Sequence, residues 1–354
     1  GNPPWIEYSK VKKVYRVDGY LTESAGNLYG MCTERSLQIR DDVGQLSFIV
    51  QLPIVSSSRM DSVREVLRNN SQGLHVIPFD DRPGKLFSGL QHCRSAIFFS
   101  QGGSGSADFK YNTTRYQRWY SETRDSLFDM IDFVTVTPEA SLHSNQFGKY
   151  AGSYERDVFE RAKAKSSSIV GQHLSRQSSE HFVFYQEATQ YWVKATVGLP
   201  HYAKNGEVGA PAHGRYMYCL SPQHAKAIGA LMHSSLFYMY FVAYSDGFHL
   251  SSQLATEFPM NEAILEDAAL AMLSDELMAD LKANADHKTI TTSKGDEIEY
   301  AQFYGSQSKH IMDEIDRVLA RHYGFTDEEL DFIINYDIKY RMGDDLFEDD
   351  EGEE

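Results

Sequence analysis

The residues best suited to chemistry in this sequence form its first tetrad, Asn2, Pro3, Pro4 and Trp5. Proline fixes φ and has no N–H, which frees the neighbouring carbonyls from local hydrogen bonding. The side-chain oxygen of Asn2 and a neighbouring carbonyl can therefore both accept from one exocyclic amine, and Trp5 offers a ring face for stacking. This pattern suits a planar amine, such as N6 of an adenine rotated out of a duplex. A plain proline turn at a frayed chain end is the alternative.

The segments after the tetrad alternate between helix and strand patterns. Apolar residues recur with helical spacing in Asn27–Arg40 and in Met60–Asn69. The nearly continuous apolar run Gly44–Ile54 is typical of a strand buried on both faces, and Leu74–Phe79 and Ser95–Ser100 predict two more strands. Helices placed between strands predict one half of an α/β, doubly wound domain.

Later segments predict a linker, short strands and long helices. Gln101–Ala107 is rich in glycine and serine and predicts the linker, because it lacks the last glycine of both G-x-S-x-G and G-x-G-x-x-G. Residues 119–131 predict a helix, and residues 150–220 predict short strands separated by long loops. Three further helices are predicted at Gln223–Tyr240, Asn261–Ala285 and Lys309–His322. Thr326 followed by Glu329 predicts a capping box at a helix start.

The net charge of −16 comes from the last quarter of the chain. Residues 1–101 carry 12 Lys and Arg against 10 Asp and Glu, and residues 102–260 carry 14 of each. Residues 261–354 carry 8 against 26, and residues 344–354 alone hold eight carboxylates. We expect this last run to be a solvated, disordered tail. The rest of the chain is close to neutral and leaves room for a local basic face that binds DNA.

Composition argues against several other classes of protein. The longest apolar stretch, Leu236–Tyr244, is much shorter than the roughly 20 residues that span a bilayer, so we expect no membrane association. Three scattered cysteines exclude a disulfide scaffold and fit a cytoplasmic protein. The 13 histidines include no H-E-x-x-H, so no metal site is predicted.

The tetrad resembles the catalytic motif of amino-directed DNA methyltransferases. The elements after it, through Lys85-Leu86-Phe87-Ser88-Gly89 to the strand at Ser95–Ser100, are similar in order to the catalytic half of an N6-adenine methyltransferase of the bacterial restriction–modification type. Residues 232–237 and the stretch from Tyr244 to Phe258-Pro259 resemble the target-recognition domain of these enzymes, with His233 where asparagine is usual. Residues 315–343 resemble their helical end.

This resemblance implies a domain plan and a cofactor. The second half of a Rossmann-like methyltransferase domain would occupy residues 1–101, and an α+β target-recognition domain residues 108–260, joined by a linker at 102–107. A helical C-terminal segment at 261–343 and a disordered acidic tail at 344–354 would follow. In such enzymes the S-adenosylmethionine site precedes the tetrad, and no F-x-G-x-G follows a strand in this sequence. We therefore expect that site to lie mostly outside this chain, and the chain alone to be inactive without a missing N-terminal half or a partner subunit.

The resemblance also implies roles for individual residues. Asn2 and the Pro3 carbonyl would accept from the adenine amine, Pro4 completes the catalytic motif, and Trp5 and Phe87 would stack on the flipped base. Ordinary core packing is the alternative for both rings. Two basic groups are candidates for contacts to duplex DNA, the first in the loop after the tetrad and the second farther on: Lys10, Lys12, Lys13 and Arg16, and then Arg156, Arg161, Lys163 and Lys165. A solvated charged face is the alternative for each of them.

Together these features predict part of a site-specific methyltransferase that modifies adenine N6 in duplex DNA, within a restriction–modification or phage-defence system. Two other functions stay open. In the first, the chain is a non-catalytic DNA-specificity module that serves a partner subunit. In the second, the chain methylates another planar amine, in RNA or protein.

Overall fold

The apolar run predicted as a buried strand forms β1 (Gln45–Gln51) in the computed structural model, which describes residues 1–87, 93–103, 109–137 and 139–342. The chain divides into two compact units. Unit 1 comprises residues 1–160 and 242–247, and unit 2 comprises residues 161–241 and 248–354. Each unit is described by itself below.

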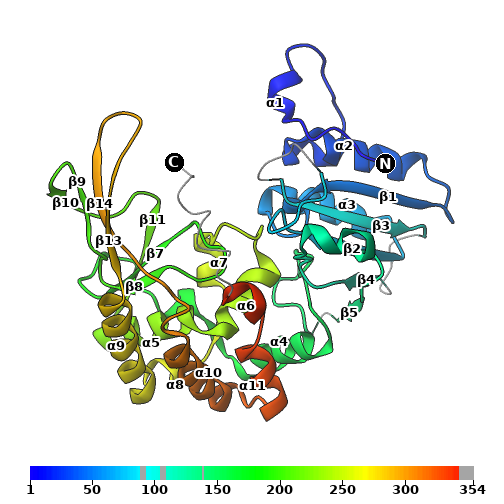
Figure 1. Cartoon of the computed structure of the whole chain (residues 1–354). Coiled ribbons are helices and arrows are strands. Elements are labelled where there is room, and N and C mark those ends of the chain that lie inside the picture. The colour runs from blue at the N-terminus through cyan, green and yellow to red at the C-terminus, as the bar shows by residue number, and fades with distance from the viewer. Residues whose placement is uncertain (88–92, 104–108, 138, 343–354) are drawn as a thin grey trace. The chain divides into compact units, whose positions relative to one another are not determined.

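Unit 1 is built on a mixed five-stranded sheet with the order β1-β3-β2-β4-β5 (Figure 1). The other four strands are β2 (Gly73–Phe79), β3 (Ser95–Gln101), β4 (Lys110–Thr113) and β5 (Val134–Val136). β3 lies antiparallel between β1 and β2, whereas β4 pairs with β2 in parallel. The domain is therefore mixed α/β, and its sheet departs from the all-parallel pairing of a doubly wound domain.

The described part of unit 1 contains the two helices that apolar spacing predicts and two that it does not. They are α1 (Tyr8–Val11), α2 (Leu28–Ile39) and α3 (Asp61–Asn69), and α4 (Ser153–Lys165) begins in this unit. Asn27 caps α2 by accepting from the Tyr29 N–H at 3.3 Å. Buried Val63, Val66 and Leu67 make the inner face of α3. The helices predicted at Asn27–Arg40 and Met60–Asn69 are thus present.

The predicted boundary at residue 101 does not coincide with the edge of unit 1. β4 and β5 continue the sheet, because residues 110–113 pair with β2. Residues 104–107 of the predicted linker lie outside the described part of the chain. The helix predicted at 119–131 is wrong: a short 3-10 helix at Ser121–Ser126 is present instead, and Trp119 and Leu127 pack with Ile77 and Phe79 in the core.

Residues 242–247 complete unit 1 although they follow the long excursion into unit 2. The hydroxyl of Tyr244 accepts from the Leu142 N–H at 2.9 Å, and the buried Lys149 ammonium donates to the Ser245 carbonyl at 2.6 Å. Tyr150 and Tyr244 share a further hydrogen bond between their buried hydroxyls. These contacts make the short segment part of the unit 1 core.

Unit 2 combines three small sheets with helices. Its strands are β6 (Ser168–Ile169), β7 (Phe182–Gln186), β8 (Ala195–Val197), β9 (Tyr202–Lys204), β10 (Glu207–Val208), β11 (Gly214–Tyr218), β12 (Pro259–Met260), β13 (Asp286–Thr291) and β14 (Glu297–Gln302). They pair as β11-β7-β8, β10-β9-β14-β13 and β12-β6. The segment 261–343, predicted to be helical, thus contains a β-hairpin, which lies beside β9 in Figure 1.

Of the three long helices predicted in unit 2, the one at Lys309–His322 is confirmed as α10 and the other two are each divided. The helices of unit 2 are α5 (Pro222–His233), α6 (Ser235–Tyr244, whose last residues belong to unit 1), α7 (Ser252–Thr256), α8 (Glu262–Leu265), α9 (Ala268–Ala283), α10 (Lys309–Tyr323), α11 (Asp327–Ile334) and α12 (Ile338–Arg341). The helix predicted at 261–285 is split into α8 and α9. The capping box at Thr326 and Glu329 is confirmed. The acidic tail lies outside the described residues.

The helix predicted at 223–240 is two helices that break at Ser234 with a bend of 64°. The Ser234 hydroxyl donates to the Leu231 carbonyl and accepts from the Phe237 N–H, and the buried Asp316 carboxylate accepts from the N–H groups of Ser235 and Leu236. No single described helix is long and apolar enough to cross a membrane; by length and composition, only the bent pair α5 and α6 passes that test together.

Candidate functional site

The tetrad is held in place by pairing of the residue before it with β1. The Gly1 nitrogen donates to the Ser47 carbonyl at 2.7 Å, and the Ile49 N–H donates to the Gly1 carbonyl at 3.0 Å. One residue that is hydrogen-bonded to two residues of the adjacent strand, here Ser47 and Ile49, which are two positions apart, shows the pattern of parallel pairing. The chain therefore runs alongside β1 at Gly1, and Asn2 to Trp5 follow in the direction in which β1 approaches its carboxyl end.

Two acceptors of the tetrad are unused. The side chain of Asn2 is exposed, and Pro3 beside it is buried. Within the described part of the chain, neither the Asn2 side chain nor the Pro3 carbonyl has a hydrogen-bond partner. An amide oxygen and a carbonyl that are both free can accept the two N–H bonds of one primary amine.

Trp5 is fixed by the same strand. Its indole N–H donates to the Ile49 carbonyl at 3.3 Å, which orients the ring. The Phe87 ring lies next to it, with the ring centroids 6.0 Å apart and the planes at 76°. The structure thus brings together the two rings predicted to hold a base. In this edge-to-face arrangement the rings contact each other, so a base stacked on both requires that one of them turns.

The loop that carries Phe87 is anchored at both of its described ends. Asp80, directly after β2, accepts from the Arg118 guanidinium at 2.9 Å and from Arg94 at 3.2 Å. Burial alone raises the pKa of Asp80, but the two guanidinium groups outweigh it and hold the pKa below its ordinary value. Near Phe87, Arg124 donates to the carbonyls of Lys85 and Leu86 at 3.1 and 2.9 Å.

The basic loop after the tetrad, Tyr8–Gly26, begins and ends beside the site. The Tyr8 N–H donates to the Gly26 carbonyl at 2.8 Å, and the Leu28 N–H donates to the Ile6 carbonyl at 2.9 Å. An ion pair between Glu7 and Arg59 joins the base of the loop to the 3-10 helix Ser58–Met60, which directly precedes α3. All four predicted cations of this loop are exposed and have no ion-pair partner among the described residues: Lys10, Lys12, Lys13 and Arg16.

The second basic group is divided between the two units. Arg156, in unit 1, forms an ion pair with Asp157 at 2.8 Å. Arg161, in unit 2, donates to the Glu329 carboxylate at 3.1 Å, and this carboxylate also belongs to the capping box of α11. Lys163 and Lys165 are exposed in the last turn of α4. Contact of these four cations with DNA stays a prediction.

His233, the departure from the usual asparagine, is buried at the end of α5. Its Nε2 donates to the Ala195 carbonyl at 2.8 Å, and burial lowers its pKa to about 4. Sequence reasoning missed the groups that position the site, above all Arg59 and Arg124. Nothing in their local sequence distinguishes them, since each acts on a segment at least 38 residues away.

Comparison with known proteins finds only distant similarity. No family model matches the chain, and no curated protein sequence matches it. A nuclease-deletion mutant of the type ISP restriction-modification enzyme LlaGI, solved with a DNA substrate mimic, aligns with a TM-score of 0.42 and 11% identity over 85% of this chain and 46% of that chain. The DrdV–DNA complex aligns with a TM-score of 0.39 and 9% identity over 95% of this chain and 56% of that chain. The ATP-dependent type ISP enzyme LlaBIII bound to DNA gives 0.37 and 12% over 85% and 33%. The chain spans roughly half of these solved chains or less.

Proposed function

We propose that this chain is part of a DNA methyltransferase that modifies the N6 amine of an adenine rotated out of the duplex. The observation that carries the proposal is the pair of free acceptors, the Asn2 side-chain oxygen and the Pro3 carbonyl, beside the oriented ring of Trp5. The exposed cations on the adjoining loop add a means of holding the phosphates of a duplex nearby.

The chemistry assigned to the tetrad is to bind and orient the amine. Asn2 and Pro3 accept its two N–H bonds, which draws electron density onto nitrogen and aims its lone pair away from the two acceptors. Trp5 stacks on one face of the base, and Phe87 on the other after one ring has turned. Holding the amine in a single orientation is the main contribution that such a site makes to group transfer.

The methyl donor in this proposal is S-adenosylmethionine, which supplies an electrophilic methyl group. The described residues do not fit a complete site for it. A glycine-rich turn between a strand and a helix is expected there, yet in the described part of the chain β3 is followed by Gly102 and Gly103 and then by β4. We therefore assign none of the described residues to the donor and expect its site to be formed mostly outside this chain.

The test compares two asparagine variants in the full-length product of the gene that encodes this chain. Duplex DNA is incubated with labelled S-adenosylmethionine, and the digested nucleosides are separated to find the labelled base. We expect N6-methyladenine, and we expect Asn2→Ala to lower its rate of formation by about 100-fold or more, as removal of a preorganised hydrogen-bonding group does in other active sites. Asn145→Ala, an exposed asparagine in the same unit, is the control.

The other outcomes separate the alternatives. Label formed at an unchanged rate by Asn2→Ala means that this chain is a non-catalytic specificity module and that a partner carries the chemistry. Label that appears in RNA or protein, without competition from duplex DNA, means that another planar amine is the substrate. A loss of both DNA binding and the helical signal in Asn2→Ala points to misfolding. Trp5→Phe, a milder change at the same site, then separates a loss of activity from a loss of the fold.

A further inference from the structure

Three side chains with metal-binding atoms share one face of the four-stranded sheet of unit 2. His287 on β13 lies opposite Ala301 on β14. On the other side of β14, the Ala301 N–H donates to the His201 carbonyl at 3.1 Å, next to the β9 pairing of Tyr202 with Tyr300. His201, Ala301 and His287 thus form one row across three strands. Glu299 is two residues before Ala301 and therefore projects from the same face.

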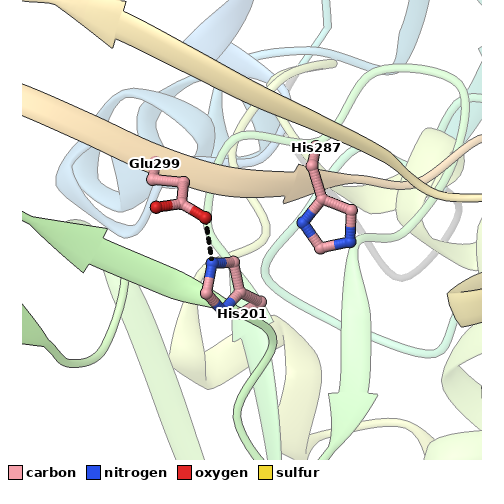
Figure 2. A group of neighbouring side chains, drawn as sticks. All are labelled: His201, His287 and Glu299. Carbon is pink, nitrogen blue, oxygen red and sulfur yellow. Dashed lines mark hydrogen bonds and ion pairs between the residues drawn. The ribbon is translucent and has the colours of Figure 1, made fainter.

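The small side chain in the middle of the row leaves space between the two imidazoles. Figure 2 shows His201, His287 and Glu299 turned toward a common point. Nε2 of His201 is 3.0 Å from the Glu299 carboxylate, and the centroids of the His201 and His287 rings are 5.4 Å apart. One ligand atom from each residue lies within 4.8 Å of the other two. Ligands around a tetrahedral Zn²⁺ are about 3.4 Å apart, given bond lengths near 2.1 Å, so exposed side chains reach that spacing by small rotations.

Charges on the neighbouring strands do not oppose a cation here. Lys204 and Lys288 stand an odd number of residues from His201 and His287, so they project from the opposite face of the sheet. Lys204 is also paired with Asp296 at 2.6 Å. The Glu299 carboxylate supplies a negative charge on the site's own face.

We propose that His201, His287 and Glu299 bind one divalent transition-metal ion of the Zn²⁺ class. Two imidazoles and a carboxylate suit such ions, whereas Mg²⁺ and Ca²⁺ prefer oxygen ligands alone. Three protein ligands leave a fourth position for water or for a group from a partner. The ion links β9, β13 and β14, and so it ties together two β-hairpins that are about 80 residues apart in sequence. This site is independent of the methyltransferase proposal, because every ligand belongs to unit 2.

The test titrates the full chain, freed of metal and of any histidine tag, with ZnCl₂ in a calorimeter. We expect one ion per chain. Loss of even an outer-shell partner of a metal site costs about 10- to 100-fold in affinity, so His287→Ala and Glu299→Gln are expected to lose at least as much. His310→Ala, an exposed histidine on α10, is the control and should bind as the unmodified chain does. A tenfold excess of MgCl₂ should not compete.

A second measurement reports on the link between the hairpins. Zn²⁺ should slow hydrogen exchange of the β13 and β14 amides in the unmodified chain and not in His287→Ala, which keeps the hydrogen bond between His201 and Glu299. Circular dichroism confirms that the variants remain folded. Absence of Zn²⁺ binding, binding that His287→Ala leaves unchanged, or bound Zn²⁺ that leaves β13 and β14 unprotected would overturn the proposal.

Discussion

Replacing His233 by glutamine tests how strongly one buried imidazole makes the stability of unit 2 depend on pH. His233 is 7% exposed, and its Nε2 donates to the Ala195 carbonyl. Burial lowers its pKa from 6.5 to about 4, against the smaller opposite effect of the carbonyl. The folded unit therefore keeps this ring neutral over a pH range in which the unfolded chain takes up a proton.

The sign and size of the effect follow from proton linkage. Because the unfolded state binds more protons between pH 6.5 and 4, the free energy of unfolding falls as the pH falls through this range. Lowering the pH from 7.5 to 5 costs about 2 kcal/mol for a pKa difference of this size. Glutamine keeps an N–H donor near the position of Nε2 and does not titrate. Between pH 7.5 and 5 we expect the free energy of unfolding of His233→Gln to fall by about 2 kcal/mol less than that of the unmodified protein.

The nearby Asp316 requires that the two proteins be compared directly. Burial raises the pKa of Asp316 to about 6, so this carboxyl makes the free energy of unfolding rise as the pH falls toward 3.8. This opposite contribution is present in both proteins and cancels in their difference. Urea unfolding followed by circular dichroism at four pH values measures that difference, with His310→Gln as the exposed control. Parallel loss of stability in the unmodified protein and His233→Gln would refute the reasoning.

Two further predictions concern the basic loop and a helix cap. Lys12→Gln and Lys13→Gln should each weaken binding to any duplex and lower the slope of log K against log salt by about 1, measured by fluorescence anisotropy. Lys226→Gln, which removes a lysine already paired with Asp275, should leave that slope unchanged, and an equal change in all three variants would contradict the assignment. Thr326→Ala removes the cap of α11 and should lower the free energy of unfolding of unit 2 by about 1 kcal/mol in urea melts. Thr326→Ser should restore this free energy of unfolding. If Thr326→Ala is as stable as the unmodified protein, the capping box contributes nothing.

Periodicity in the sequence located the elements that bury a clear apolar face. α2, α3, α10 and the strands β2 and β3 lie where the pattern predicts them, because burial is what creates the pattern. β1 also forms where a strand is predicted, but only Val50 of its residues is buried, so the expected burial of both faces is wrong. The bend between α5 and α6 was invisible because residues on both sides of Ser234 are buried all round. The hairpin β13–β14 was missed although Thr289, Ile290 and Thr291 are typical of strands. β14 alternates acidic and apolar residues from Glu297 to Tyr300, but this signal is short, β13 has only one large apolar residue, and the hairpin lies between two strong helices.

The candidate sites likewise differ in whether they depend on local sequence or on long-range contacts. The tetrad is contiguous, so the sequence alone is enough to propose it as a site. The approach of Phe87 to Trp5, and the row formed by His201 and His287, depend on loop anchoring and strand register between distant segments. These long-range relations have no local sequence signal.

The split composition of unit 1 has a consequence for how the protein is made. Its last segment, residues 242–247, contributes Tyr244 and the acceptor of Lys149, yet 81 residues of unit 2 are synthesised first. Domains usually fold one after another as they leave the ribosome. Here unit 1 cannot complete its core until 81 of the 188 residues of unit 2 have emerged, so the two units do not fold as independent, successive domains. Exchange of unit 2 between related proteins would have to join the chain at three points, at 160/161, 241/242 and 247/248, and keep the 242–247 segment in register with Leu142 and Lys149.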